Sequence, residues 1–594
     1  MSATQRPVGV SFLVNPVGTE TIFTPEQFTD DHRAFAATAE QFMLKEVHPF
    51  AEELERQADD NRLMVAKVRK AGELGFLMAD IPEAYGGLGV DKTTSMLVAE
   101  KIATYLSFSV SLGAHAGIGT LPIVYFGNEA QKQRYLPLLA TGELLAAYAL
   151  TEPSSGSDAL GARTTATLVD NGDGTRSWSL NGTKMWITNS GFADLFIVFA
   201  KVDGKQFSAF IVPRSTPGLS TGAEERKMGI KGSSTRMLIL EDVRVPEENL
   251  LGEVGRGHKI AFNILNVGRF KLGVAMLGMA KYAMGISVRY AGERVAFGAP
   301  IATFGAIRTK IAAMQKELFV LESMSYRIAG YMDAVIDTLD SSAPDYPQHV
   351  MAAIEEFAVE DSILKVYGSE VASRVIDEGV QIHGGYGFSQ EYEIERLYRD
   401  ARINRIYEGT NEVNRLLIPG MIIRRGMSGQ LDLMGLLARV QASMAAGAAA
   451  APEEQGLARE AFVVEQCKAV EMQVANLAIQ KHMTGLEQQQ ALMLGLADML
   501  MAVYGADCTV ARVLQAGDGA RAEHVAAARL AVDDAQELVH AVARRLLPSL
   551  VAGGDLAAAR AAVAGMHAPL SFDRLAAEEA LAASAVAQGG WSLS

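Results

Sequence analysis

Residues 381–388 read Gln381-Ile382-His383-Gly384-Gly385-Tyr386-Gly387-Phe388, and residues 406–412 read Ile406-Tyr407-Glu408-Gly409-Thr410-Asn411-Glu412. The second stretch places one carboxylate, Glu408, between an aromatic ring and a glycine, shortly after a glycine-dense loop. Glycine lets a backbone pass close to a bulky ligand, and a carboxylate in an apolar cleft can act as a general base. Loops of this composition are more often plain turns, so the functional interpretation depends on the rest of the chain.

A β-prone region begins near Tyr148 and covers residues 146–256. Short apolar runs there are separated by turn signals, so we expect a small antiparallel β domain with turns at Asn171-Gly172, Asn181-Gly182 and Asp203-Gly204. No G-x-G-x-x-G segment follows a strand and opens a helix, so a dinucleotide-binding Rossmann fold is not expected.

The rest of the chain reads as three helical blocks. Residues 1–145 precede the β domain, and residues 257–424 follow it and end around Pro419-Gly420. Residues 425–594 form an Ala- and Leu-rich block with a loose connector at 445–451. The predicted fold class is mainly α with a central antiparallel β domain and an additional C-terminal helical domain.

Charge and cysteine content limit the partners and the compartment. The net charge of −15 argues against nucleic-acid binding, which needs a basic surface. The two cysteines, Cys467 and Cys508, form no CxxC pair, so we expect no disulfide, no metal site and a reducing compartment. The N-terminus resembles neither a signal nor a transit peptide, and no window approaches an uncharged apolar run of about 20 residues. We therefore expect a cytoplasmic protein without membrane insertion.

Two segments of the β region carry polar groups suited to a flat ligand. The loop from Thr151 to Asp158 gathers hydroxyls and glycine N–H groups, typical of a site for pyrophosphate or the polar edge of a ring; an ordinary capped turn is equally compatible. Trp186 and Thr188 stand two residues apart, which places both on one side of a strand. They could cover and hydrogen-bond an isoalloxazine ring, or Trp186 could belong to the core.

Two arginines lie near the start and around the end of the long helix that follows, and the first, Arg269, has apolar or small neighbours. Arg269 lies near the start of this helix, and Arg294, close to Phe297, lies around its end. Arg294 invites a phosphate-clamp interpretation. The alternatives are a solvated side chain for Arg269 and a cation at a helix C-terminus for Arg294.

These motifs, in this order, resemble the acyl-CoA dehydrogenase family of flavoenzymes. The very-long-chain branch is the most similar, because the chain has an extra C-terminal helical block and because residues 111–119 and 265–270 resemble segments of that branch. The resemblance covers nearly the whole chain and rests on residues 148–158, 184–189, 243–252, 294–298, 381–388 and 407–410.

The resemblance implies an FAD-dependent enzyme that converts long-chain acyl-CoA to trans-2-enoyl-CoA. Glu408 resembles the base that removes the α-proton, while the β-hydride passes to flavin N5 and the electrons go on to an electron-transfer flavoprotein. Some relatives carry the base at the position of Gly268, which cannot abstract a proton here. The alternatives are an acyl-CoA oxidase, which passes electrons to oxygen, and a non-enzymatic, nucleic-acid-associated relative.

The resemblance also implies the ligand contacts. Arg294, Gln381 and the Gly384-Gly385 pair resemble groups that hold the FAD of the neighbouring subunit, which implies at least a homodimer. The residues expected to contact FAD are Tyr148, Leu150, Thr151, Gly156, Ser157, Trp186, Ile187, Thr188, Arg294, Phe297, Gln381, Gly384, Gly385, Thr410 and Glu412. Those expected to contact the acyl-CoA substrate are Ser157, Asn266, Arg269, Tyr407 and Gly409.

Three small residues, Gly113, Ala114 and Gly117, bear on acyl chain length. They stand where medium-chain relatives carry larger polar residues, so we expect a deep apolar tunnel, in which each additional buried CH₂ adds about 0.8 kcal/mol to binding. The alternative is close helix packing.

The C-terminal block is not expected to bind membranes. Arg439 is the only cation between residues 427 and 456, which is poor chemistry for anionic lipid. We expect the block to extend the helical domains or the dimer contact.

Overall fold

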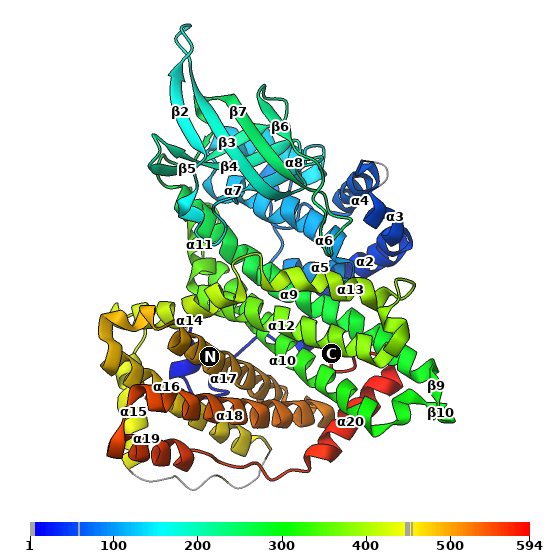
Figure 1. Cartoon of the computed structure of the whole chain (residues 1–594), viewed down its shortest axis with the longest axis vertical. Helices are drawn as coiled ribbons and strands as arrows, with labels where there is room; N and C mark the ends of the chain where they lie inside the picture. Colours follow the sequence, from blue (N-terminus) through cyan, green and yellow to red (C-terminus); the bar gives the residue numbers. More distant parts are fainter. Residues whose placement is uncertain (1–5, 58–59, 446–451, 453–455) are drawn as a thin grey trace.

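A computed structural model describes residues 6–57, 60–445, 452 and 456–594. In Figure 1 the strands lie at the top, the long helices of the following block run through the middle, and the C-terminal helices lie below. The predicted fold class, mainly helical around a central β domain, is confirmed. The predicted connector at 445–451 lies, apart from Ala445, outside the described residues.

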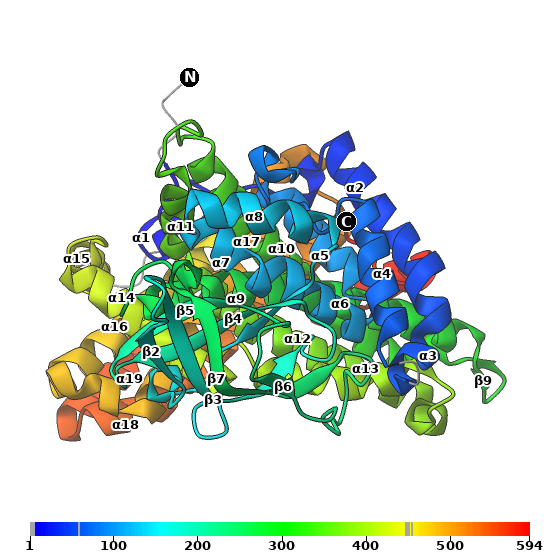
Figure 2. The same ribbon diagram turned by 90° about the horizontal axis from the view of Figure 1, so that it is seen from above.

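The N-terminal helices bury one apolar stripe, which includes Ala39, Phe42, Met43 and Val47. After Phe42 the helix widens into a π-helical turn at Met43–Val47. The helices of this region are α1 (Ser11–Val14), α2 (Asp30–Phe42), α3 (Ala51–Arg56), α4 (Arg62–Glu73), α5 (Lys92–Ile102), α6 (Leu106–Gly113), α7 (Leu121–Phe126) and α8 (Glu129–Thr141), with a second π-helical turn, Ala114–Gly119, after α6. Seen from above (Figure 2), α6 and α7 lie between the strands and the outer helices α2–α4.

One sheet forms the β domain, with strand order β6-β7-β3-β2-β4-β5-β8 and β1 paired with β4. Neighbouring strands are antiparallel except for β1–β4 and β2–β4, which are parallel. The predicted turns at 171–172 and 203–204 join β2 to β3 and β4 to β5. The strands are β1 (Ala146–Ala149), β2 (Thr165–Asp170), β3 (Arg176–Thr188), β4 (Leu195–Val202), β5 (Gln206–Pro213), β6 (Leu219–Thr221), β7 (Thr235–Pro246) and β8 (Leu250–Leu251).

The predicted turn at Asn181-Gly182 is wrong, because β3 runs straight through it. The register between β3 and β7 shifts between Leu180 and Gly182, so the glycine marks an irregularity within the strand. A Cβ atom on Gly182 would lie 2.5 Å from Thr164 Oγ1. Gly182 is therefore explained by the close contact between the two segments. In the sequence, a glycine needed for such a contact cannot be told from a glycine in a turn.

The long helices of the next block pack through small residues. A Cβ on Gly368 of α12 would lie 2.9 Å from the carbonyl oxygen of Gly273 on α9, so the two backbones approach closely there. The elements are α9 (Gly257–Glu293), the hairpin β9 (Val295–Ala296) and β10 (Ala299–Pro300), α10 (Gly305–Ile336), α11 (Tyr346–Glu356), α12 (Ala358–His383), α13 (Glu393–Ala401) and α14 (Asn411–Met427).

The domain boundary predicted around Pro419-Gly420 falls inside a helix. Helix α14 continues through both residues to Met427, and Ile418, Pro419, Gly420 and Ile422 are buried. Packing of this face outweighs the backbone hydrogen bond that the proline removes.

The C-terminal helices form a bundle against the middle of the molecule. They are α15 (Leu433–Ala445), α16 (Ala458–His482), α17 (Gln490–Ala516), α18 (Ala522–Leu550), α19 (Gly553–Gly565) and α20 (Arg574–Gln588). The N-terminal segment 8–28 crosses between this bundle and the core, and we call it the N-terminal strap. Its Val17 N–H donates to Glu465 Oε1 at 3.0 Å, and its Ile22 N–H donates to Gln515 Oε1 at 2.9 Å.

Buried ion pairs connect the strap, the bundle and the core. Arg512 of α17 donates to Glu26 of the strap at 2.7 Å and to Glu322 of α10 at 2.8 Å. Glu322 also pairs with Lys281 of α9, which in turn binds Glu100 of α5 at 2.9 Å. Four helices and the strap thus share one buried network.

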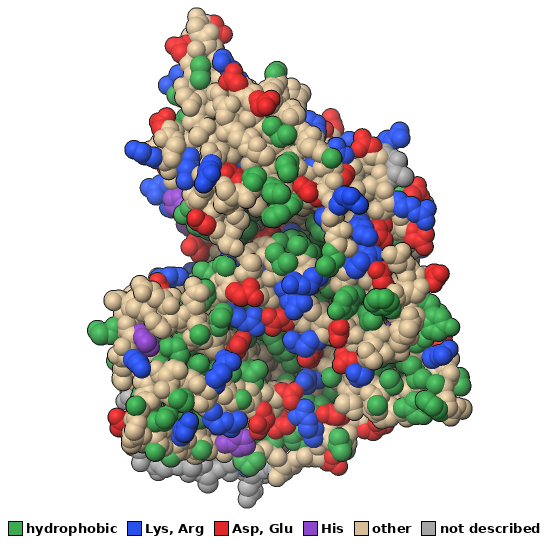
Figure 3. Space-filling view, in the orientation of Figure 1, with side chains coloured by type: hydrophobic (Ala, Val, Ile, Leu, Met, Phe, Trp, Pro, Cys, Tyr) green, Lys and Arg blue, Asp and Glu red, His purple; other side chains and the backbone are tan. Residues whose placement is uncertain are grey.

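Within the part of the chain that the structure describes, three helical segments are long and apolar enough to span a membrane, in contrast to our expectation from the sequence. They are Leu106–Phe126, Gly257–Glu293 and Gln490–Gly519, whose most apolar windows are 67%, 72% and 78% buried inside the protein. Their apolar faces pack against other elements, which explains their composition. On the face shown in Figure 3, positive and negative side chains are interspersed, and hydrophobic side chains gather around a hollow below the β domain.

Candidate active site

Glu408 stands in a turn with unusual backbone geometry. Its φ angle of 57° and that of Gly409, 79°, lie in the left-handed region. This conformation costs a non-glycine residue roughly 1–3 kcal/mol and persists only where the surroundings hold it. The turn lies between the 3₁₀ turn Arg402–Arg405 and α14.

Three side chains hold the carbonyl groups of this turn. Arg269 Nε, from α9, donates to Glu408 O at 3.4 Å, and Lys365 Nζ, from α12, donates to Gly409 O at 2.7 Å. Asn414 Nδ2, from α14, donates to both carbonyls, at 3.3 and 2.8 Å. Three helices therefore fix the direction in which Glu408 points.

The Glu408 carboxylate is enclosed and available for a proton. A Cβ on Gly268 would lie 2.7 Å from Glu408 Oε2, so the glycine leaves the space that the carboxylate fills. Oε2 has no hydrogen-bond partner among the described residues. Burial raises the pKa of Glu408 to about 7, although the charges of Arg269 and Lys365 act to lower it. A carboxylate with this pKa suits general-base chemistry near neutral pH.

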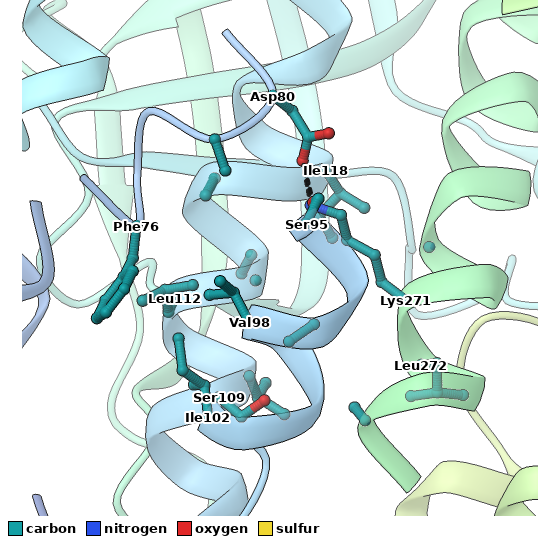
Figure 4. A pocket seen from close by; sticks show the side chains of 18 of the residues that line it. Phe76, Asp80, Ser95, Val98, Ile102, Ser109, Leu112, Ile118, Lys271 and Leu272 are labelled. Atoms are coloured by element: carbon teal, nitrogen blue, oxygen red, sulfur yellow. Dashed lines mark hydrogen bonds and ion pairs between the residues drawn. The ribbon is translucent and has the colours of Figure 1, made fainter. Parts of the chain in front are cut away.

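This carboxylate lines a cavity between α5, α6 and α9, shown in Figure 4. Thr188 at the end of β3 and Tyr407 also line it. Of the three residues predicted to deepen the tunnel, Gly113 and Ala114 line the cavity and Gly117 does not. Its apolar walls include Phe76, Leu77, Val98, Ile102, Leu112 and Ile118.

The two β-domain motifs of the predicted FAD site lie side by side. Met185 N–H donates to Thr151 O at 2.9 Å, and Lys184 Nζ donates to Leu150 O at 3.2 Å. Lys184 also pairs with Glu152 at 2.7 Å, and both side chains are buried. This ion pair joins the loop after β1 to β3. It is a positioning contact to which our sequence interpretation assigned no role.

Trp186 is not a core residue. Trp186 is 59% exposed and its φ angle is 56°, whereas Ile187 is buried in the sheet core. The register between β3 and β7 shifts between Lys184 and Ile187, so the regular alternation that predicted one shared side for Trp186 and Thr188 is broken there. Trp186 remains open to a ligand, and Thr188 faces the cavity.

A second group of predicted FAD residues lies elsewhere in the chain. These residues lie just after α9 or around the end of α12, and all of them are exposed, Phe297 to 99%. They are Arg294, Phe297, Gln381, Gly384 and Gly385. Figure 1 shows the β9–β10 hairpin at an edge of the molecule, away from the β domain. One chain therefore does not bring this group to Thr188. That arrangement agrees with a role toward a neighbouring subunit, which stays a prediction.

The remaining predicted FAD residues lie in a loop and at a helix start. Gly156 and Ser157 are exposed in the loop after β1. Thr410 caps α14 by accepting from Val413 N–H at 3.3 Å, and Glu412, two residues further on, is exposed.

Arg269 and Asn266 are both buried and joined at 3.0 Å. The solvated alternative for Arg269 is therefore wrong. Its guanidinium contacts the backbone of the Glu408 turn.

The residues present fit a flavin. Tyr148 Oη is buried without a hydrogen-bond partner among the described residues, so a polar group of a ligand could form a hydrogen bond with it. Added Cβ atoms at Gly156, Gly384 and Gly385 would meet nothing within 4 Å, so these backbones are open to close approach.

Sequence interpretation missed Lys365 and Asn414, the two side chains that hold Gly409 O. A lysine inside a helix otherwise rich in apolar residues gives no motif, and its partner lies 44 residues away. Asn414 follows the Glu408 motif directly and could have been suspected from its position.

Family comparisons cover most of the chain. Residues 29–143 match the acyl-CoA dehydrogenase N-terminal domain, residues 147–243 the middle domain and residues 255–422 the C-terminal domain. Residues 466–563 match a further acyl-CoA dehydrogenase C-terminal domain.

Individual relatives agree. A probable acyl-CoA dehydrogenase of Bacillus subtilis (strain 168) is 46% identical over 555 residues, which is 92% of each chain. The very long-chain specific acyl-CoA dehydrogenase of Homo sapiens is 40% identical over 394 residues, 64% of this chain and 57% of that protein. The crystal structure of an acyl-CoA dehydrogenase complexed with FAD from Bacillus anthracis matches with a TM-score of 0.95 and 46% identity, over 98% of this chain and 100% of that one. The chain therefore belongs to the acyl-CoA dehydrogenase family, FAD-dependent enzymes that dehydrogenate acyl-CoA.

Proposed function

We propose that the enzyme acts on long-chain acyl-CoA, with Glu408 as the base that removes the α-proton and trans-2-enoyl-CoA as the product. The observation that carries this proposal is the position of Glu408. Its carboxylate, whose pKa burial raises to about 7, lines an apolar cavity formed by three helices. A thioester whose acyl chain occupies that cavity would present its α-carbon to this base.

The chain's own residues prepare this proton transfer. Arg269, Lys365 and Asn414 hold the Glu408–Gly409 turn, so the base keeps one direction. Apolar side chains around the cavity exclude water once a chain is bound, which favours proton uptake by the carboxylate. FAD, when bound, supplies the acceptor for the β-hydride. Trp186 and Thr188 are the residues we expect to cover and orient its ring.

The support for long chains is that the small residues Gly113 and Ala114 line the cavity together with apolar side chains. Each further buried CH₂ adds about 0.8 kcal/mol to binding. The test is an anaerobic titration of the holoenzyme with C4, C8, C12 and C16 acyl-CoA, followed by flavin bleaching and turnover. We expect the optimum at C12 or longer, and an optimum at C8 or below would refute the long-chain assignment.

We propose that the electrons pass to an electron-transfer flavoprotein. The family membership and the similarity to dehydrogenases over nearly the full length support this choice over an oxidase. Peroxide formation during turnover of palmitoyl-CoA in air separates the two: rapid, stoichiometric peroxide would favour the oxidase.

We also propose a homodimer in the cytoplasm. The exposed group around Arg294 and Gly384 is separated from Thr188 within one chain, which supports a shared site between subunits. Both cysteines are buried as free thiols, as expected in a reducing compartment. Sedimentation equilibrium tests the first statement, and cell fractionation tests the second.

A further inference from the structure

One wall of the acyl-chain cavity is ionic, although most of its lining is apolar. Asp80, Ser95 and Lys271 all line the cavity, and Figure 4 shows them close together, with Ile118 beside them. Asp80 comes from the loop before α5, Ser95 from α5, and Lys271 from α9, one helical turn after Gly268. Glu408 and this ionic wall therefore line the same cavity, so one bound acyl chain could contact both.

In this wall three side chains donate to Asp80, and Lys271 keeps N–H groups that are not used by any described residue. Asp80 Oδ2 accepts from Lys271 at 2.5 Å and from Ser95 at 2.9 Å, while Asp80 Oδ1 accepts from Lys92 at 2.7 Å. The Asp80 side chain is only 4% exposed, whereas that of Lys271 keeps 21%. Lys271 has one recorded acceptor for its three N–H groups among the described residues, so its ammonium retains donors.

We propose that Lys271, Ser95 and Asp80 form a polar subsite that binds a hydroxyl group carried by the acyl chain. The substrate class is thus hydroxylated fatty acyl thioesters, in addition to plain ones. The inference rests on the proposed function, since it takes the cavity as the acyl-chain site.

Charge selects a hydroxyl group over a second carboxylate. Two lysines, Lys271 and Lys92, share the carboxylate of Asp80, and Glu408 adds a second carboxylate to the lining of the same cavity. A substrate carboxylate would face Asp80 at close range, which is unfavourable. A hydroxyl group can accept from Lys271 and donate to Asp80 or Ser95 without adding charge.

The same cluster could simply tie α9 to the loop before α5. In that case the cavity would behave as a purely apolar pocket. Such a pocket discriminates against a substrate with an added hydroxyl group by about 100-fold. A polar subsite removes this discrimination at the chain position that reaches it, and the size of the penalty therefore separates the two interpretations.

The test uses the FAD-loaded full chain and compares a plain C16 acyl-CoA with the same chain bearing one hydroxyl group, moved from C6 to C14. The measured quantity is the ratio of kcat/KM for the hydroxylated chain to that for the plain chain. We expect this ratio to be within about 5-fold of unity at one or two adjacent positions and about 100-fold below unity elsewhere.

Lys271→Met should then lower the ratio at the favoured positions by at least 10-fold, because Asp80 stays paired with Lys92 but the free donor is gone. Ser95→Ala, which changes the wall less, provides a second variant with a smaller decrease if Lys271→Met fails to fold. Leu272→Met, an apolar change in the same cavity, should leave the ratio as in the unmodified enzyme.

Two results would overturn the subsite: a uniform penalty at all positions in the unmodified enzyme, or an unchanged ratio in Lys271→Met. Failure of the proposed function looks different, because the plain chain itself would then not be turned over.

Discussion

Gly268 and Glu408, on different segments of the chain, occupy complementary space: a Cβ on the glycine would lie 2.7 Å from Oε2 of the glutamate. The side chain of Glu408 thus fills the space beside the position at which some relatives carry their base. The two arrangements exclude each other sterically.

Gly268→Ala should displace the carboxylate and lower kcat by about 10- to 100-fold, since a misplacement of about 1 Å can cost 100-fold. FAD content should be unchanged. Gly292→Ala, on the same helix with no atom within 4 Å of the added Cβ, is the matched control and should behave as the unmodified enzyme. Equal activity of both variants would contradict the steric argument.

Glu408→Gln should retain bound, yellow FAD and lose turnover by several orders of magnitude. The amide is similar in size but cannot accept the α-proton. Stopped-flow measurement of flavin bleaching checks this directly. Glu253→Gln, an exposed carboxylate remote from the cavity, serves as the control.

Turnover should depend on pH through Glu408. The base acts only when unprotonated, and burial raises its pKa to about 7. The rate constant kcat/KM should therefore rise as the pH increases through about 7 and level off above it. A profile that is flat from pH 5.5 to 8.5 would speak against Glu408 as the base.

Lys365→Met should move that pH limb to higher pH and lower kcat by about 10-fold. The lysine holds Gly409 O, and its charge lowers the pKa of Glu408, so its loss both loosens the turn and raises that pKa further. Lys365→Arg, which keeps the positive charge, should reverse part of this shift of the pH profile. If Lys365 had a purely structural role, its loss would reduce thermal stability or FAD content but leave unchanged the pH at which kcat/KM rises.

Arg512→Leu should lower the free energy of unfolding by about 3–5 kcal/mol, as expected when a buried charge loses its partner. The guanidinium binds Glu26 and Glu322, and all of its own side chain is buried. Arg424→Leu removes a surface pair with Glu487 at 3.4 Å and should cost below about 1 kcal/mol. Urea denaturation of the two variants gives the comparison.

The order of helical and β regions could be predicted because the change from helical to β spacing is strong. The local motif around Glu408 also singled out a carboxylate that lines a cavity, and its role as the base stays a prediction. Local signals misled where packing decided the outcome. Gly182 serves a close contact inside β3, and Pro419 stays within α14 because its face is buried.

Contacts between distant segments could not be predicted in this way. Lys365 has no local feature that connects it to Gly409, and the pair Lys184–Glu152 became visible only when β3 and the loop after β1 were seen together. The polar wall of the cavity likewise combines Asp80, Ser95 and Lys271 from three segments, none of which suggests a ligand alone.

The N-terminal strap has a consequence for how the polypeptide matures. Its backbone is fastened to Glu465 and Gln515, and its Glu26 to Arg512, all in the last third of the chain. These three partners follow their strap residues by 448 to 493 positions in the sequence, whereas the strap's contacts with Arg327 and Glu360 involve residues that are translated earlier. The strap can therefore contact the core before it contacts the C-terminal bundle, and its docking is complete only once residues 465–515 have been synthesised.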